Sequence, residues 1–254
     1  MRLLFIKFLI IFFSLTVSFN ILFAKEYKYD VRAYNLNIMQ IDFKIDDEVN
    51  NTINFHAESV GIVGFFVKVF ASAQDTFDKN KDTWNYVYRY DKPTANKYRI
   101  NKVLFSKEKV LSFETDPPRL DDITKKVPRK SQDYFGAIDP IYAVKKLFLN
   151  DKNNFNCNKK IKTFDGNTFY YLIMSKQNDE LDFHSTFSPY KGKLQKCSLI
   201  YVPISGYIPD DPNLPAQFKV DIYFGIVGDN YFPIYATTRG KKGIRLKMYL
   251  NEVN

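Results

Sequence analysis

Two histidines, His56 and His184, are the side chains best suited to acid–base chemistry near neutral pH. His184 lies close in sequence to Asp179 and Asp182, either of which could act with it as a general base. His56 falls on the polar side of an alternating segment, where a solvated side chain is expected. The sequence has no glycine-rich phosphate loop and no Gly-x-Ser-x-Gly nucleophile motif. We therefore predict no enzyme and no cofactor, and a hydrolase built on His184 is the alternative.

Adjacent carboxylates occur at Asp121-Asp122 and Asp210-Asp211, in stretches that predict loops. Hydrolysis by paired acids needs two carboxyl groups held at a fixed separation on rigid elements, and loop neighbours do not supply this. Two cysteines and two distant histidines lack the spacing typical of metal ligands. We predict neither a paired-acid active site nor a metal site.

The two cysteines, Cys157 and Cys197, suit one disulfide if the chain is exported, because an oxidising compartment favours pairing of an even number of thiols. The closed loop would hold about 41 residues, which the chain-entropy model values at ~4 kcal/mol. The alternative is a pair of free, buried thiols.

Residues 1–24 predict a secretory signal peptide. Arg2 and Lys7 give a positive start, and the apolar run that follows ends just before a polar segment. Leu22 stands where a small residue is preferred for cleavage, so an uncleaved N-terminal anchor is the alternative. We expect one β-rich domain over 25–254 in the periplasm, which is not an integral membrane protein once the signal is removed.

Composition excludes several classes of protein. The chain has 254 residues, of which 45% are apolar and 26% charged, as in ordinary globular proteins. This excludes a disordered chain and a polytopic membrane protein. The net charge is +9, and a basic exported protein can favour anionic membrane surfaces or lipid head groups. Lysines are scattered without forming a basic cluster, so no nucleic-acid partner is expected.

Aromatic content and period-two alternation indicate β structure. The chain contains 24 Phe, 18 Tyr and 1 Trp, residue types that suit half-buried pleated surfaces. Alternating or apolar strand-like segments occur at about 27–33, 41–46, 53–58, 84–90, 98–113, 161–174, 199–204, 218–224, 231–238 and 244–250. Because each presents one dry face, we predict a single curved antiparallel sheet or half-open β-barrel with about a dozen strands.

One segment, about 139–149, predicts an α-helix. Asp139 can cap its first turn, and Pro140 suits the first helical position. Ile141, Val144 and Phe148 fall on one face at three- and four-residue spacing. Elsewhere, Asp165-Gly166 predicts a tight hairpin turn, because both positions of such a turn need positive φ.

One apolar stretch combines Gly61, Gly64, Phe65, Phe66 and Phe70 without clean alternation. It is too apolar for a surface loop, and its glycines allow a sharp bend or a close backbone approach. Two interpretations are open. The stretch is either a buried strand or short helix that plugs a barrel end, or an apolar lip at the mouth of a ligand cavity.

The order of several motifs resembles an exported bacterial family called domain of unknown function 3108. The most specific motifs are the Phe164-Asp165-Gly166 hairpin flanked by the two cysteines and the segment Pro203-Ile204-Ser205-Gly206-Tyr207. The resemblance implies a signal peptide, a periplasmic location and a β-rich domain. It also implies that the cysteines act as a staple and that Pro203, Gly206 and Tyr207 are turn residues. It implies no activity, because the family has none assigned.

A looser architectural likeness is to periplasmic lipoprotein carriers, whose open barrel holds acyl chains, although fold does not fix function. Three functional hypotheses result. The first is a non-enzymatic envelope protein whose curved sheet binds an apolar or lipid-like ligand. The second is a structural or interaction module in which a sheet edge or the 205–216 loop docks an envelope protein. The third is the hydrolase based on His184.

Overall fold

The structure is a computed structural model that describes residues 25–46, 52–118, 125–151, 153–209, 218–240 and 243–254. The predicted signal peptide, both adjacent-carboxylate pairs and most of the 205–216 loop lie outside these residues. Within the described ranges, no helix is long and apolar enough to cross a bilayer.

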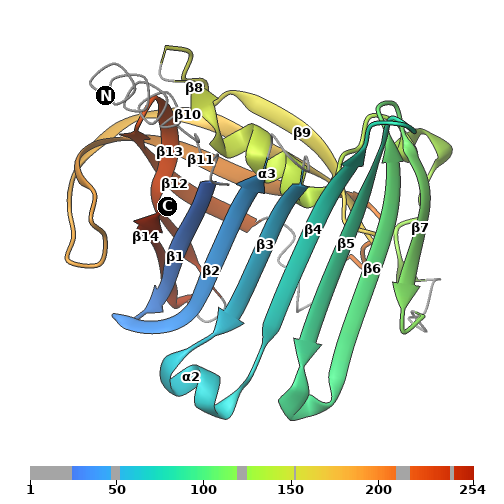
Figure 1. The fold of residues 1–254 in the computed structure, drawn as a ribbon, viewed down its shortest axis with the longest axis horizontal. Coiled ribbons are helices and arrows are strands. Elements are labelled where there is room, and N and C mark those ends of the chain that lie inside the picture. The colour runs from blue at the N-terminus through green and yellow to red at the C-terminus, as the bar shows by residue number, and fades with distance from the viewer. Residues whose placement is uncertain (1–24, 47–51, 119–124, 152, 210–217, 241–242) are drawn as a thin grey trace, which may run out of the picture.

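A single antiparallel sheet forms the body of the molecule (Figure 1). Its strands in chain order are β1 (Lys25–Ala33), β2 (Leu36–Asp46), β3 (Thr52–Ser59), β4 (Phe70–Asp78), β5 (Thr83–Lys92), β6 (Lys97–Ser106), β7 (Val110–Asp116), β8 (Asn150–Asp151), β9 (Lys159–Phe164), β10 (Phe169–His184), β11 (Lys191–Ser205), β12 (Phe218–Val227), β13 (Asn230–Arg239) and β14 (Arg245–Val253). The helical elements are α2 (Gly61–Phe66), η1 (Pro93–Ala95), η3 (Ser131–Tyr134) and α3 (Pro140–Phe148).

The sheet curves without closing. Its strand order is β7-β6-β5-β4-β3-β2-β1-β14-β13-β12-β11-β10-β9, with β8 added beside β13. The connecting segment, residues 125–138, bridges the two edges of the sheet. Phe135 pairs with Lys109, just before β7, and Ile138 pairs with Thr163 of β9. The predicted fold class, a curved antiparallel sheet or half-open barrel with one clear helix, is confirmed.

The predicted helix is α3, which packs on the inner, concave face of the sheet (Figure 1). The Asp139 carboxylate accepts hydrogen bonds from the backbone N–H groups of Ile141, at 2.9 Å, and Tyr142, at 2.8 Å. This satisfies two donors that a helix start leaves unpaired. Ala143 and Leu147 are fully buried, so α3 is fixed to the sheet by packing as well as by its cap.

Two buried clusters hold the layers together. The larger lies between the concave face and α3 and includes the aromatic rings of Phe164, Phe169 and Phe232. The smaller contains both cysteines, and the structure joins Cys157 and Cys197 in a disulfide with Cα atoms 6.0 Å apart. The disulfide is therefore buried among apolar side chains and ties the segment after α3 to strand β11.

Two long strands exceed their predicted limits. The alternation predicts strands that end near residue 174 and begin near 199, whereas β10 runs to His184 and β11 begins at Lys191. The extra length pairs residues 180–184 of β10 with residues 191–195 of β11. Phe183 and Leu194 are buried in the core, but most of the neighbouring residues are polar and exposed, so the apolar alternation is too short to mark the limits of the strands.

Pro203 lies within β11 and not at a turn as expected. It pairs with Tyr170, whereas Ser205 pairs with Phe169, so Ile204 is an extra residue between the two pairs. Such a bulge interrupts the hydrogen-bond ladder, and this is a place where a strand can accept a proline, which has no N–H to donate.

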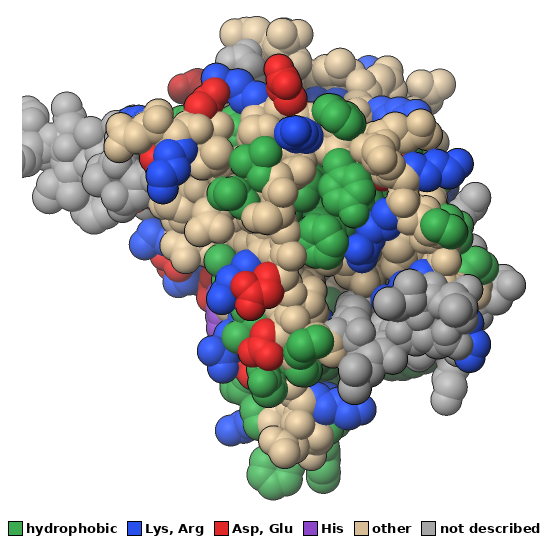
Figure 2. All heavy atoms as spheres, turned by 90° about the vertical axis from the view of Figure 1, so that its right-hand side faces the viewer, with side chains coloured by type: hydrophobic (Ala, Val, Ile, Leu, Met, Phe, Trp, Pro, Cys, Tyr) green, Lys and Arg blue, Asp and Glu red, His purple; other side chains and the backbone are tan. Residues whose placement is uncertain are grey.

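The lower end of the sheet is narrow and carries exposed hydrophobic side chains (Figure 2). This is the end at which β3 passes through α2 into β4 (Figure 1). The opposite end of the concave face is covered by α3 (Figure 1).

Candidate functional site

The histidines do not form a buried catalytic arrangement. His184 Nε2 lies 3.3 Å from Asp182 Oδ1, but both side chains are about two-thirds or more exposed, at 67% and 74%. His56 Nε2 lies 4.0 Å from Glu58 Oε2 on the outer surface. An exposed pair gains little from electrostatics, because water screens it. Among the residues that the structure describes, no three His, Cys, Asp or Glu side chains are grouped to hold a metal ion.

An apolar crevice lies between the concave face and α3. It has a volume of about 280 Å³ and is open to solvent. Its lining is almost wholly hydrocarbon and aromatic: Tyr29, Ile41, Phe43, Phe55, Ala73, Tyr86, Tyr88, Pro140, Ile141, Val144, Phe148 and Met248. Three of its four α3 residues, Ile141, Val144 and Phe148, lie on the helix face that the sequence pattern identifies.

Strand register creates the hollow. Phe43 pairs with Phe55, Phe55 with Ala73, and Ala73 with Tyr88, so these four residues form one row across strands β2 to β5. Residues paired across neighbouring strands share a face. Ala73 is the one small residue in a row of aromatic rings, and the missing volume leaves space in front of it.

The tyrosine hydroxyl at one wall of this apolar crevice is satisfied within the protein. Tyr29 donates a hydrogen bond from its hydroxyl to the backbone carbonyl of Pro233, at 3.2 Å. The Tyr29 ring therefore faces the crevice, and its hydroxyl is not left unpaired there. An unpaired hydroxyl in the crevice would disfavour an apolar ligand.

A buried carboxyl group lies beside the crevice. Asp75 follows Ala73 by two residues on β4 and so shares its face, and it pairs with the crevice residue Tyr86. It is 2% exposed, and its Oδ1 accepts no hydrogen bond from the described residues. Burial, and after it the nearby Asp139 carboxylate, raises the pKa of Asp75 to about 8, whereas Lys145 and a hydrogen bond from the backbone of Thr76 oppose the shift.

Asp139, the cap of α3, is the second member of this pair. Burial raises the pKa of Asp139 to about 6, and the hydrogen bonds from the backbone of Tyr142 and Ile141 oppose that shift. Sequence reasoning identified Asp139 only as a helix cap and did not identify Asp75. A usable signal was present, because Asp75 is the one acid in the alternating series Ala71, Ala73, Asp75, Phe77.

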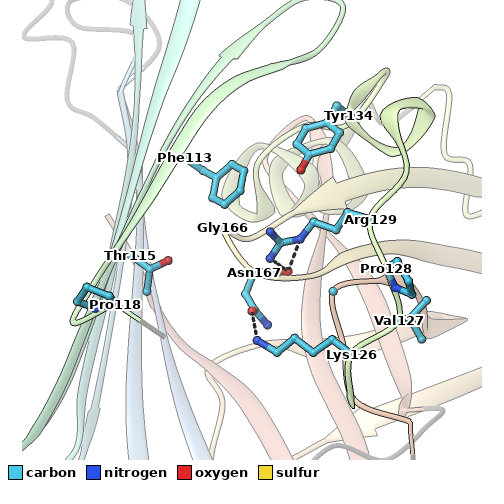
Figure 3. Close-up of a pocket in the computed structure, with 11 residues that line it drawn as sticks. Phe113, Thr115, Pro118, Lys126, Val127, Pro128, Arg129, Tyr134, Gly166 and Asn167 are labelled. Carbon is cyan, nitrogen blue, oxygen red and sulfur yellow. Dashed lines mark hydrogen bonds between the residues drawn. The ribbon is translucent and has the colours of Figure 1, made fainter. Parts of the chain in front are cut away.

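A second hollow, the seam pocket, lies between the sheet edge β7 and the β9–β10 turn and has a volume of about 640 Å³ (Figure 3). Phe113 and Thr115 of β7 form one side, and Gly166 and Asn167 of the turn face them (Figure 3). The connecting segment that bridges the two sheet edges completes the wall with residues 126–129 and Tyr134.

Two cations lie on the wall of the seam pocket, and both bind the turn (Figure 3). Arg129 donates from Nε and Nη2 to the backbone carbonyl of Asn167, at 3.2 and 2.5 Å. Its guanidinium carbon also lies 5.0 Å from the ring centre of Phe113. Lys126 Nζ lies 3.5 Å from Asn167 Oδ1. These contacts connect the two edges of the sheet on either side of the seam pocket. Arg129 and Lys126 therefore stabilise the junction between those edges.

A hairpin turn at Asp165-Gly166 is part of this wall, but only Gly166 has a positive φ, so it is not the tight turn with two positive-φ residues that the sequence predicts. Asp165 Oδ1 accepts from the backbone N–H groups of Asn167, at 2.8 Å, and Thr168, at 2.7 Å. Gly166 has φ +91°, and a Cβ there would lie 2.9 Å from the Cβ of Asn101. Only glycine tolerates both conditions without strain.

The turn residues implied by the family resemblance, Gly206 and Tyr207, are fixed against the connecting segment. Gly206 has φ +79° and donates from its backbone N–H to the Val127 carbonyl, at 2.8 Å. The Val127 N–H donates in return to the Tyr207 carbonyl, at 2.8 Å. A turn therefore follows β11 at Gly206, whereas Pro203 lies inside the strand.

The predicted lip residues lie away from both hollows. Gly61, Gly64, Phe65 and Phe66 are in α2, and Phe70 begins β4. Neither the apolar crevice nor the seam pocket is lined by any of them. One interpretation of the sequence is a short helix that plugs a barrel end. The helix is present, but the side chains of Phe65 and Phe66 are exposed to solvent. Their role as a ligand lip stays a prediction.

Comparisons with known proteins support the fold. No model of a known protein family matches the chain, and no curated protein matches it. The fold is similar to the crystal structure of a β-barrel-like protein of domain of unknown function DUF1849 from Brucella abortus. The TM-score is 0.51 at 9% identity, over 91% of this chain and 97% of that one. A "putative lipoprotein from Parabacteroides distasonis ATCC 8503" matches with a TM-score of 0.30 at 9% identity, over 91% of this chain and 95% of that chain.

The similarity to the Brucella abortus protein shows a β-barrel-like fold and carries no activity with it, because that domain is itself of unknown function. The resemblance to domain of unknown function 3108 remains a sequence-based prediction, since no family model matches.

Proposed function

We propose that this protein binds an apolar, lipid-like ligand in the apolar crevice and acts in the cell envelope without enzymatic chemistry. The observation that carries the proposal is the crevice itself, a solvent-open hollow whose walls are hydrocarbon and aromatic on both the sheet and the helix side. Each methylene group moved from water into such a site contributes about 0.8 kcal/mol. A hydrocarbon chain therefore fits this lining better than a polar metabolite does.

The size of the crevice limits the ligand. Its volume of 280 Å³ is close to the lower end of the range of about 300–1,000 Å³ typical of small-molecule sites. It suits part of one hydrocarbon chain, with the polar end of the molecule outside in solvent.

Export is part of the same proposal. We propose that residues 1–24 are a signal peptide and that residues 25–254 form one periplasmic domain. The disulfide between Cys157 and Cys197 supports this proposal, because structural disulfides persist in oxidising compartments. Fractionation of cells that express the full chain, followed by mass measurement of the mature protein, would test both the location and the cleavage.

The test of ligand binding uses Ala73→Leu, which adds side-chain volume at the one small position of the aromatic row. Binding of the apolar fluorophore diphenylhexatriene should weaken by more than about tenfold. The leucine would displace a part of the fluorophore about as large as two methylene groups, and burial of two such groups contributes about that factor in affinity. Native mass spectrometry of protein extracted gently from its own envelope should show a bound lipid that Ala73→Leu reduces.

The control is Gln74→Leu, which places the same side chain next door on the opposite, exposed face of β4. It should bind the fluorophore as the unmodified protein does. Equal binding by both variants and the unmodified protein would refute the crevice as the site. Recovery of a single crosslinked envelope protein with no lipid would instead favour the interaction module.

A further inference from the structure

We propose that the end of the sheet formed by the β1–β2, β3–β4 and β5–β6 connections docks on an anionic lipid bilayer. We call this surface the rim. It is independent of the crevice and goes beyond the proposed function, because it concerns where the protein sits and not what it carries. Successive antiparallel strands place the three connections at the same end (Figure 1).

Exposed apolar side chains are concentrated on the rim. Phe65 and Phe66 of α2 are 82% and 70% exposed, and Tyr34 of the β1–β2 turn is 78% exposed. Ile62, Leu36 and Tyr98 add to the same end. Single exposed apolar residues need no explanation, but a grouped set that includes two adjacent phenylalanines marks an interaction surface.

These side chains are displayed by an ordered backbone. The N–H of Val60 donates to the Ile38 carbonyl at 3.1 Å, and that of Ser59 donates to the Val69 carbonyl at 3.0 Å. The Ser59 hydroxyl donates to the Val67 carbonyl, at 2.8 Å, and accepts from the N–H of Val69, at 2.9 Å. The exposure of the phenylalanines is therefore built into the connection, so insertion into a membrane would not require the segment to unfold.

Glycine at the start of α2 brings the tip close to its neighbour. Gly61 has φ +60°, and a Cβ at this position would lie 2.8 Å from the Asn37 carbonyl oxygen of β2. The close approach keeps α2 against the end of the β1–β2 hairpin, so the phenylalanines and the exposed side chains of that hairpin belong to one surface.

Charge identifies the partner. The residues beside the connections include Lys68, Lys92 and Lys97, whereas the two nearest acids, Glu58 and Asp91, are fewer than these lysines. Asp91 accepts from Arg89 Nε at 2.6 Å, and Glu58 lies 4.0 Å from His56. Lysines that flank exposed aromatic residues match an anionic lipid surface, which attracts basic groups while its hydrocarbon boundary accepts the rings.

Shape supports a bilayer over a protein partner. The end of the molecule that bears α2 projects and is convex (Figures 1 and 2). A deformable lipid interface accepts a projecting aromatic tip, whereas a protein partner would need a matching cavity. At six residues, α2 is too short to span a membrane as a helix, and the proposed insertion is into the bilayer surface.

The test measures co-sedimentation of the full chain with phosphatidylcholine vesicles, with and without phosphatidylglycerol. The protein should bind the phosphatidylglycerol vesicles, and added salt should weaken binding. Changing both Phe65→Ser and Phe66→Ser should lower the partition coefficient by at least about tenfold, since even one buried phenylalanine ring accounts for such a factor. The doubly substituted Lys68→Gln, Lys97→Gln variant should bind with less salt dependence.

The control is Phe135→Ser, which removes another exposed phenylalanine from the connecting segment far along the sheet from α2. It should bind vesicles as the unmodified protein does, and so should the crevice variant Ala73→Leu. Failure of the unmodified protein to bind anionic vesicles would overturn the proposal. So would equal binding by the Phe65/Phe66 variant, or a concentration-dependent dimer that this variant abolishes, because the rim would then be covered by a second copy.

Discussion

Asp75 should make the stability of this protein fall as pH rises. Burial raises the pKa of the Asp75 carboxyl to about 8 in the folded protein, whereas an aspartate in an unfolded chain titrates near about 3.9. Between these two values the folded state keeps a proton that the unfolded state has released. A state that binds more protons is favoured at low pH, so the free energy of unfolding decreases with rising pH throughout this window.

The size of the effect comes from the two pKa values. Each pH unit inside the window costs about 1.4 kcal/mol, so the difference of about four units amounts to ~5 kcal/mol as an order of magnitude. Below about pH 4 both states hold the proton, and above about pH 8 neither does, so the stability curve flattens at both ends. Asp139 adds to the decline between about pH 4 and pH 6, because its own pKa is raised to about 6.

Asp75→Asn tests this reasoning, because the amide keeps the shape of the carboxyl and cannot ionise. Urea unfolding at about pH 5 and about pH 8 should show a much smaller loss of stability in the variant than in the unmodified protein. Asp82→Asn, at an exposed carboxyl that contacts Lys107 in solvent, should leave the slope unchanged. An unchanged slope in Asp75→Asn, or a variant destabilised equally at both pH values, would refute the assignment.

Two further substitutions test the contributions of the disulfide and of the Gly166 turn to stability. Cys157→Ser should lower the free energy of unfolding by about 4 kcal/mol, and a reducing agent should reproduce the loss in the unmodified protein. Full thiol labelling of both native cysteines would contradict the disulfide. Gly166→Ala should cost about 1–3 kcal/mol in thermal unfolding, because it adds strain at φ +91° and a contact with Asn101. Gly136→Ala, at φ +67° with open space around it, should cost less, and equal losses would remove the role of that contact.

Sequence reasoning succeeded where one local signal determines one local structure. The alternation at 218–224 and 244–250 predicts β12 and β14, because these strands place one face against the core. Asp139 and Pro140 predict the start of α3, because a cap and a first-turn proline act within a few residues of the helix start.

The candidate site depends on information that is not local. Ala73 leaves a hollow because β2, β3 and β5 place Phe43, Phe55 and Tyr88 beside it, and that row requires the strand order and register. The same holds for the seam pocket, whose walls come from β7 and from the β9–β10 turn. The alternation of polar and apolar residues predicts which face of a strand is buried. It does not predict which other strands that face lies beside.

The exposed α2 tip shows a different limit. A run of apolar residues indicates burial in the core only when those residues do not form an exposed interaction surface. The pattern of Gly61 to Phe70 favours a core element or a cavity lip, and the structure instead places its phenylalanines in solvent. Hydropathy alone does not distinguish a core from a surface that meets another apolar phase.

The pairing of β1 with β14 has a consequence for folding during synthesis of the chain. These strands lie at opposite ends of the described chain, and Glu26 and Asn254 exchange two backbone hydrogen bonds, at 3.0 and 2.9 Å. Each half of the sheet is a meander that can assemble as it emerges, but the junction between them waits for the final strand. Until then β1 presents an unpaired edge, the kind of template that recruits foreign strands. We expect newly made chains to depend on a holding chaperone at this stage, and truncations that remove β14 to aggregate.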